Sequence, residues 1–143
     1  MSNFDTVRAI TDNILGALKT IGINFTRKAF DDDKTVPASL LPLGVVFYAG
    51  ERFENTCGQR PCYAEAEYNI KVIINARDPE DQVRELQKRA HSIRELLTVG
   101  ALNVNELAAT KLVSRVSVAR IDSENHKDRS SLSLRVVVRY REV

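Results

Sequence analysis

Hydrophobic residues recur at intervals of three and four near the start of the chain, which predicts a helix over residues 4–21. The apolar stripe of this helix would consist of Phe4, Val7, Ile10, Ile14, Leu18 and Ile21. Ser2 and Asp5 have the spacing of a capping box, and Gly22 is a natural stop signal. We therefore expect an amphipathic helix that buries this stripe.

The next region is expected to be irregular before a strand begins. Residues 24–30 (NFTRKAF) predict a short extended segment, which the acidic turn DDDKT follows. Pro37 and Pro42 disfavour regular structure up to about Leu43, because proline lacks a backbone N–H. The run GVVFYAGE (44–51) then predicts a strand that leads into a loop.

Apolar and polar residues alternate from Cys62 to Ala76, which predicts one long strand with a buried face and a solvated face. The buried face would carry Cys62, Ala64, Ala66, Tyr68, Ile70, Val72 and Ile74. The solvated face would carry Tyr63, Glu65, Glu67, Asn69, Lys71 and Asn75. Only Ile73 breaks the polar pattern of that second face.

A second helix is predicted to begin at Pro79, with Asp78 as its N-cap and Gly100 as its stop. Its buried stripe would consist of Val83, Leu86, Ala90, Ile93 and Leu97. The following NVNELAAT allows one short helical turn.

Two further strands are predicted at 111–122 and 131–143, with a polar loop between them. In the last strand the apolar residues are Leu132, Leu134, Val136, Val138 and Tyr140. The opposite face carries Ser133, Arg135, Arg139 and Arg141.

The predicted order is one helix, three strands, one helix and two strands, which indicates an α+β fold. We expect residues 1–143 to form a single domain with one mostly antiparallel sheet and two main helices packed on one of its faces. This arrangement buries every apolar stripe, but it leaves the order of the strands open.

Composition and charge narrow the function classes. The chain is 43% hydrophobic and 28% charged, as in globular proteins. Its net charge of +2 is too small to indicate binding to nucleic acid or to a membrane surface. We expect no signal peptide and no membrane-spanning segment, so a cytosolic origin is the simplest interpretation.

Metal and redox chemistry is not indicated. Cys57 and Cys62 are separated by four residues, whereas the redox motif has two, and a zinc site would need both His91 and His126 as further ligands. Cys62 fits a small buried residue of the strand better. The consecutive acids Asp31–Asp33 lack the spacing of a calcium loop. We expect no cofactor and no metal.

No catalytic constellation is apparent either, because the sequence has neither a glycine-rich phosphate loop nor a nucleophile in a strained turn. We therefore expect that the protein is not an enzyme. The polar strand faces are more informative, since Glu65 and Glu67 form an acidic stripe and Arg135, Arg139 and Arg141 a basic one. If the two strands are neighbours, the stripes pair within the sheet; if not, each is a surface patch available to a partner.

The arrangement of the whole chain resembles that of the tail terminator and tail completion proteins of long-tailed bacteriophages. The resemblance rests on the N-terminal amphipathic helix, the proline-bearing LLPLGVVFYAGE and the alternating strand YAEAEYNIKVIINA. It continues in the acid-capped helix RDPEDQVRELQKRAHSIRELL and the final hairpin VARIDSENHKDRSSLSLRVVVRY. The cysteine pair is not a feature of that family.

The resemblance implies a structural virion protein that forms a ring of six copies. This ring would cap the tail tube and join the tail to the head. Its implied partners are further copies of itself, the tail tube protein and head-completion or connector proteins, with DNA passing through the lumen without specific binding. The implied location is the virion, and the host cytoplasm during assembly.

A head-to-tail ring needs two complementary surfaces on each protomer, which charges of opposite sign can supply. The candidate subunit-interface residues are Glu65, Glu67, Lys71, Arg135, Arg139 and Arg141. Two alternatives stay open, namely another neck component such as a head-completion or adaptor protein, and a small nucleic-acid-binding module that uses the arginine face.

Overall fold

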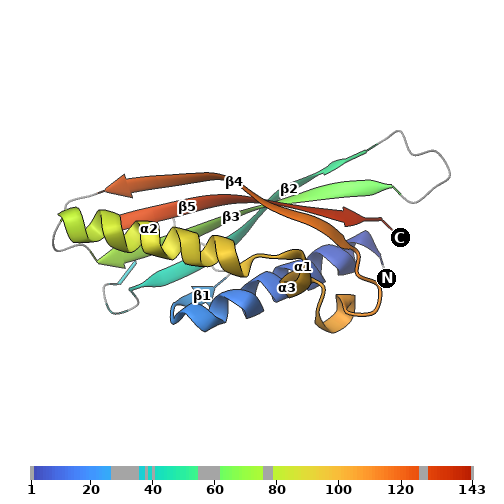
Figure 1. Ribbon diagram of the computed structural model, residues 1–143, viewed down its shortest axis with the longest axis horizontal. Coiled ribbons are helices and arrows are strands. Elements are labelled where there is room, and N and C mark those ends of the chain that lie inside the picture. The colour runs from blue at the N-terminus through green and yellow to red at the C-terminus, as the bar shows by residue number, and fades with distance from the viewer. Residues whose placement is uncertain are drawn as a thin grey trace.

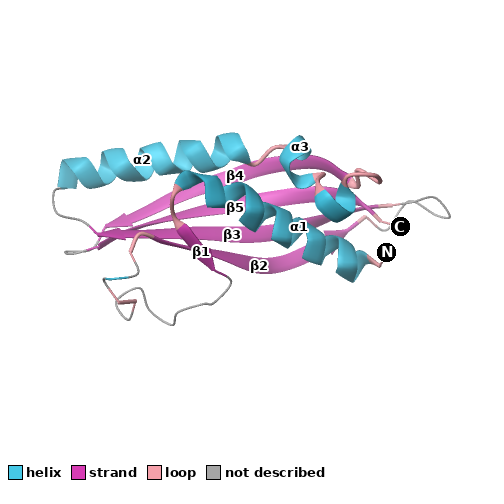
Figure 2. Ribbon diagram, turned by 90° about the horizontal axis from the view of Figure 1, so that it is seen from below, coloured by secondary structure: helices cyan, strands magenta, loops and turns pink. Residues whose placement is uncertain are grey.

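The computed structural model describes residues 2–26, 36–37, 39, 41–54, 62–75, 79–125 and 129–142. It has two main helices, α1 (Asn3–Leu18) and α2 (Pro79–Leu96), which lie on one face of a five-stranded sheet (Figures 1 and 2). The strands are β1 (Asn24–Thr26), β2 (Leu43–Phe53), β3 (Tyr63–Asn75), β4 (Val113–Asn125) and β5 (Arg129–Arg141). The predicted α+β fold is confirmed.

The strand order in the sheet is β1-β2-β3-β5-β4. β1 is parallel to β2, and the other neighbours are antiparallel. β3 and β5 pair along their whole length, from Tyr63 opposite Arg141 to Asn75 opposite Arg129. α2 therefore carries the chain from β3 to the far edge of the sheet, and β5 returns to fill the place between β3 and β4.

The capping box at the start of α1 is present. The Ser2 hydroxyl accepts a hydrogen bond from the Asp5 amide (3.1 Å), and the Asp5 carboxylate accepts one from the Ser2 amide (3.2 Å). The Ser2 hydroxyl also donates to the Asp5 carboxylate (2.9 Å), and this hydrogen bond, followed by the one from the Ser2 amide, lowers the pKa of the Asp5 carboxyl. At the other end the helix tightens into a 3-10 turn, Lys19–Ile21, and Gly22 ends it with a positive φ of 74°.

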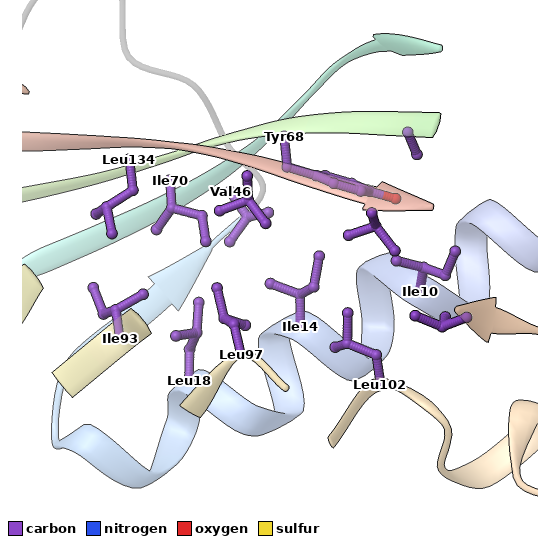
Figure 3. Close-up of a cluster of buried hydrophobic side chains, with 14 of the residues drawn as sticks. Ile10, Ile14, Leu18, Val46, Tyr68, Ile70, Ile93, Leu97, Leu102 and Leu134 are labelled. Atoms are coloured by element: carbon purple, nitrogen blue, oxygen red, sulfur yellow. The ribbon is translucent and has the colours of Figure 1, made fainter. Parts of the chain in front are cut away.

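The main core lies between the helices and the sheet, where side chains from both layers meet (Figure 3). Ile10, Ile14 and Leu18 of α1 and Ile93 of α2 point toward the strands, and the fully buried ring of Tyr68 lies across from them. The Tyr68 hydroxyl keeps a hydrogen-bond partner because it donates to the Val7 carbonyl (3.2 Å).

Two residues of the predicted helical stripes are exposed. Phe4 is 74% exposed and Val83 is 45% exposed, so their assignment to the core was wrong. Phe4 lies in the first turn of α1 beside the outer strand β2, and Val83 lies on α2 beside the outer strand β4. The helical spacing places both side chains on the face that is turned toward the sheet. They are exposed because each lies beside an outer strand, where the sheet ends.

The region after α2 also differs from the prediction. α2 ends at Leu96, and the expected stop, Gly100, lies inside a separate short helix, α3 (Val99–Leu102). The reason is a new N-cap, since the Thr98 hydroxyl accepts a hydrogen bond from the Ala101 amide (3.1 Å). The helical turn expected in NVNELAAT is present as η4 (Asn105–Leu107).

A smaller apolar cluster lies on the other face of the sheet and consists of Val36, Leu43, Val45 and Ile73, with Leu41 and Phe47 against it. This cluster explains why Ile73 interrupts the polar side of β3. Among the described residues, no helix is long and apolar enough to cross a membrane.

Candidate assembly surfaces

The predicted acidic and basic stripes lie side by side on the sheet face that points away from α1 and α2. Glu65 of β3 is directly opposite Arg139 of β5, and Lys71 is opposite Ser133. Of the two arrangements that the sequence allowed, the structure has the one in which the strands are neighbours and the stripes pair within the sheet. We call this surface the charged sheet face, and it comprises Glu54, Glu65, Glu67, Lys71, Arg115, Arg135, Arg139 and Arg141.

The ion pairs on the charged sheet face connect four strands. Glu67 of β3 contacts the guanidinium of Arg135 on β5, and Glu65 lies 3.6 Å from Arg115 of the edge strand β4. Arg139 reaches Glu54, which follows β2, at 3.1 Å. These side chains are partly exposed, and such pairs each contribute about 0–1 kcal/mol to stability.

Arg139 has a second contact, because its guanidinium carbon lies 3.8 Å from the centre of the Tyr63 ring. A cation above an aromatic face is attracted by the negative potential of that face. Arg139 is thereby held between Tyr63 and Glu54, whereas Arg141 at the strand end is exposed. The charged sheet face is thus a mixed surface in which positive and negative groups alternate.

On the helix-covered face, the carboxylate of Glu51 accepts hydrogen bonds from two tyrosine hydroxyls, an arrangement that the sequence did not predict. The buried Tyr140 hydroxyl donates to Glu51 Oε1 at 2.5 Å, and the Tyr48 hydroxyl donates to Oε2 at 2.8 Å. Burial raises the pKa of the Tyr140 phenol well above its usual value, and the hydrogen bond to Glu51 raises it further. Burial and the same carboxylate raise the pKa of Tyr48 to about 12.

The position of Glu51 depends on a β-bulge. The register between β2 and β3 shifts between Tyr48 and Gly50, and Gly50 has a positive φ of 122°. Without the extra residue, Glu51 would point to the opposite face of the sheet, because side chains alternate along a strand. The glycine near the end of the predicted strand was the one sequence signal for this bulge.

A groove of about 630 Å³ lies between the first half of α1 and the outer side of β2. Its lining residues are Phe4, Val7, Arg8, Thr11, Val46, Phe47, Tyr48 and Glu51. Two of its aromatic side chains are well exposed, Phe4 at 74% and Tyr48 at 52%. Exposed apolar side chains gathered in one groove are typical of a contact site.

The cysteine and histidine candidates are not brought together in the described part of the chain. Cys62 is half-buried just before β3, and His91 is exposed on α2. Cys57, His126 and the acidic run 31–33 lie outside the described residues. Within the residues that are described, no group of three or more His, Cys, Asp or Glu side chains is placed to hold a metal ion.

Comparison with known proteins shows a similarity of fold but no match of sequence. No protein family model matches the sequence, and no curated protein matches it. The structure is similar to a chain in the solved virion of a native gene transfer agent (GTA) particle, with a TM-score of 0.54 and 16% sequence identity. The match covers 96% of this chain and 90% of the other, so the similarity extends over nearly the whole fold.

Proposed function

We propose that the protein is a structural component of a tailed, phage-like virion and that it acts as a tail terminator. The observation that carries this proposal is the similarity of fold, over 96% of the chain, to a chain of a gene transfer agent virion. The arrangement of helices and strands that resembles tail terminators in the sequence supports the same role. In this role the chain is a single domain that is not an enzyme and works without a cofactor.

The proposed protein forms a ring, most simply a hexamer, on the end of the tail tube. It ends polymerisation of the tube and offers its outer side to head-completion or connector proteins, while DNA passes through the lumen without specific binding. It resides in the virion, and in the host cytoplasm during assembly. The charged sheet face is the proposed contact surface toward a neighbouring subunit or component, through Glu65, Glu67, Lys71, Arg135, Arg139 and Arg141.

The pairing within the sheet changes how such a contact would work. Because Glu67 already contacts Arg135 and Glu65 lies near Arg115, a partner must add to these pairs or exchange them. Exposed pairs can be exchanged at little cost, since each contributes about 0–1 kcal/mol. The carboxylates of Glu54, Glu65 and Glu67 among these arginines lower the net positive charge of the charged sheet face, which disfavours the nucleic-acid alternative.

Electron microscopy of growing tail tubes tests this role. The tube protein of the same particle is allowed to polymerise with and without the purified chain. A terminator should shorten the tubes and leave their ends covered by a ring. Tubes of unchanged length with bare ends would count against the terminator role, and binding to isolated head connectors instead would favour the adaptor alternative.

A further inference from the structure

Among the described residues, the sheet has an incompletely covered strand edge on each side. β1 pairs only with Leu43–Val45, the first residues of β2, and within the described residues no strand continues along that side of β2 from Val46 to Phe53. On the opposite side, the only described strand that pairs with β4 is β5. Unpaired backbone groups at a strand edge are ready to pair with another strand.

One end of the β4 edge is already blocked by a side chain. The Asn103 amide donates to the Val113 carbonyl (2.9 Å) and accepts from the Val113 amide (3.0 Å), as a neighbouring strand would. This contact closes the edge at the start of β4 and leaves its later part, which is exposed from Ala119 to Asn125, for another strand.

Exposed apolar side chains gather along the same two edges. Of the seven large hydrophobic side chains that are exposed in the described part of the chain, five lie there. Phe4, Tyr48 and Phe53 belong to the β2 side, where the groove of about 630 Å³ lies. Val83 and Ile121 belong to the β4 side, where they line a smaller hollow of about 150 Å³ between α2 and β4.

We infer that these two edges form a head-to-tail contact between copies of the chain, in which β4 of one copy pairs with β2 of the next. The inference rests on the proposed ring function and assigns its subunit interface. The strand directions support it: β2, β3, β5 and β4 alternate, so β4 is antiparallel to β2. Copies related by rotation about an axis along the strands would therefore join through an antiparallel pair.

One register gives complementary contacts on both faces of the joined sheet. If Ile121 lies opposite Phe53 of the next copy, two exposed apolar side chains cover each other on the helix-covered side. On the other side, Arg120 then lies opposite Glu54, and Asp122 lies opposite Arg52. Opposite charges directly across strands stabilise a pair, and this pattern sets the register as well as the partner.

The existing partners of these charges do not prevent the contact. Arg120 and Asp122 pair with each other at 3.0 Å, but their side chains are 71% and 57% exposed. Glu54 pairs with Arg139 at 3.1 Å, and 42% of the Glu54 side chain is exposed. An ion pair so exposed contributes little to stability and can be exchanged across the interface.

Disulfide cross-linking tests the register directly. In a Cys57→Ser/Cys62→Ser background, the double variant Phe53→Cys/Ile121→Cys is oxidised and separated on a non-reducing gel. The matched control replaces Ile121→Cys by Val104→Cys, since Val104 is 38% exposed against 40% for Ile121 but follows Asn103 at the blocked end of the β4 edge and is not opposite Phe53 in the proposed register. Circular dichroism checks that both variants fold.

The expected result is a ladder of covalent oligomers for the Phe53/Ile121 pair, roughly tenfold stronger than for the control, because an interface holds two thiols at an effective concentration on the order of millimolar. A closed oligomer in native mass spectrometry with no excess of cross-links would overturn this interface and leave the ring function standing. A chain that stays monomeric, both alone and on tail tubes, would overturn the ring function and the interface together.

Discussion

The two faces of the central sheet are built from alternate residues of the same strands, yet they hold the molecule together in different ways. On β3, Tyr68 and Ile70 point toward the helices and are fully buried, whereas Glu65 and Glu67 point away and form partly exposed ion pairs. Buried apolar area contributes about 25 cal/mol per Å², and exposed ion pairs contribute little. Apart from the small apolar cluster around Ile73, stability therefore resides on the helix-covered face, and the charged sheet face is free to serve contacts.

The largest effect is expected from a cavity on the helix-covered face. Ile93→Ala should lower the free energy of unfolding by about 2–5 kcal/mol, because Ile93 is fully buried against the sheet. Urea denaturation measures the change. Val83→Ala on the same helix is the matched control and should change the free energy by less than about 0.5 kcal/mol, because Val83 is exposed. Equal losses of stability for the two variants would contradict the claim that buried side chains between helix and sheet stabilise the fold.

A smaller loss is expected when the acceptor of a buried phenol is removed. Glu51→Ala should cost about 1–3 kcal/mol, because the hydroxyl of the buried Tyr140 loses its carboxylate partner. Tyr48→Phe removes only the half-exposed hydrogen bond to the same carboxylate and should cost less. Both are read from the same urea curves, and a larger loss for Tyr48→Phe would show that Tyr140 does not depend on Glu51.

The same phenol predicts a loss of stability at alkaline pH. The pKa of Tyr140 is raised above its ordinary value of 10.0, so the folded chain holds this proton more tightly than the unfolded chain does. This contribution is fully present below pH 10 and decreases as the pH rises above it. Unfolding curves at increasing pH should show the decline, and Tyr140→Phe should make it shallower. An unchanged slope would exclude Tyr140 as its source.

Ion pairs on the charged sheet face should contribute least to stability. A double-mutant cycle of Glu67→Ala and Arg135→Ala should give a coupling energy of about 0.2–1 kcal/mol, because both side chains are partly exposed. High salt should reduce it further. A coupling energy of several kcal/mol would mean that this face, too, holds the fold together.

Reversal of one charge separates assembly from folding. Arg139→Glu places a carboxylate beside Glu54 and removes the contact with Tyr63, which should lower the free energy of unfolding by about 1–2 kcal/mol and yet weaken assembly more strongly. Lys88→Glu, at an exposed position of α2, is the control for net charge. Normal assembly of Arg139→Glu at physiological salt would rule out the charged sheet face as a contact surface.

Local patterns along the sequence predicted much of the fold. The alternation from Cys62 to Ala76 identified β3 and its two faces, because side-chain direction in a strand depends only on residue parity. The capping box of Ser2 and Asp5 was likewise readable, since both partners are three residues apart.

What could not be predicted depends on contacts between distant segments. The place of β5 between β3 and β4 follows from long-range pairing, and only this pairing brings Arg139 beside Glu65. The exposure of Phe4 and Val83 depends on where the sheet ends, which helical spacing does not encode. Glu51 was missed because a bulge at Gly50 turns it toward Tyr140.

Native mass spectrometry over a range of concentrations, with the chain alone and with tail tubes, tests the central claim most directly. The proposed role predicts a discrete closed oligomer, a hexamer above all, in at least one of the two samples. A chain that remains monomeric in both would contradict it.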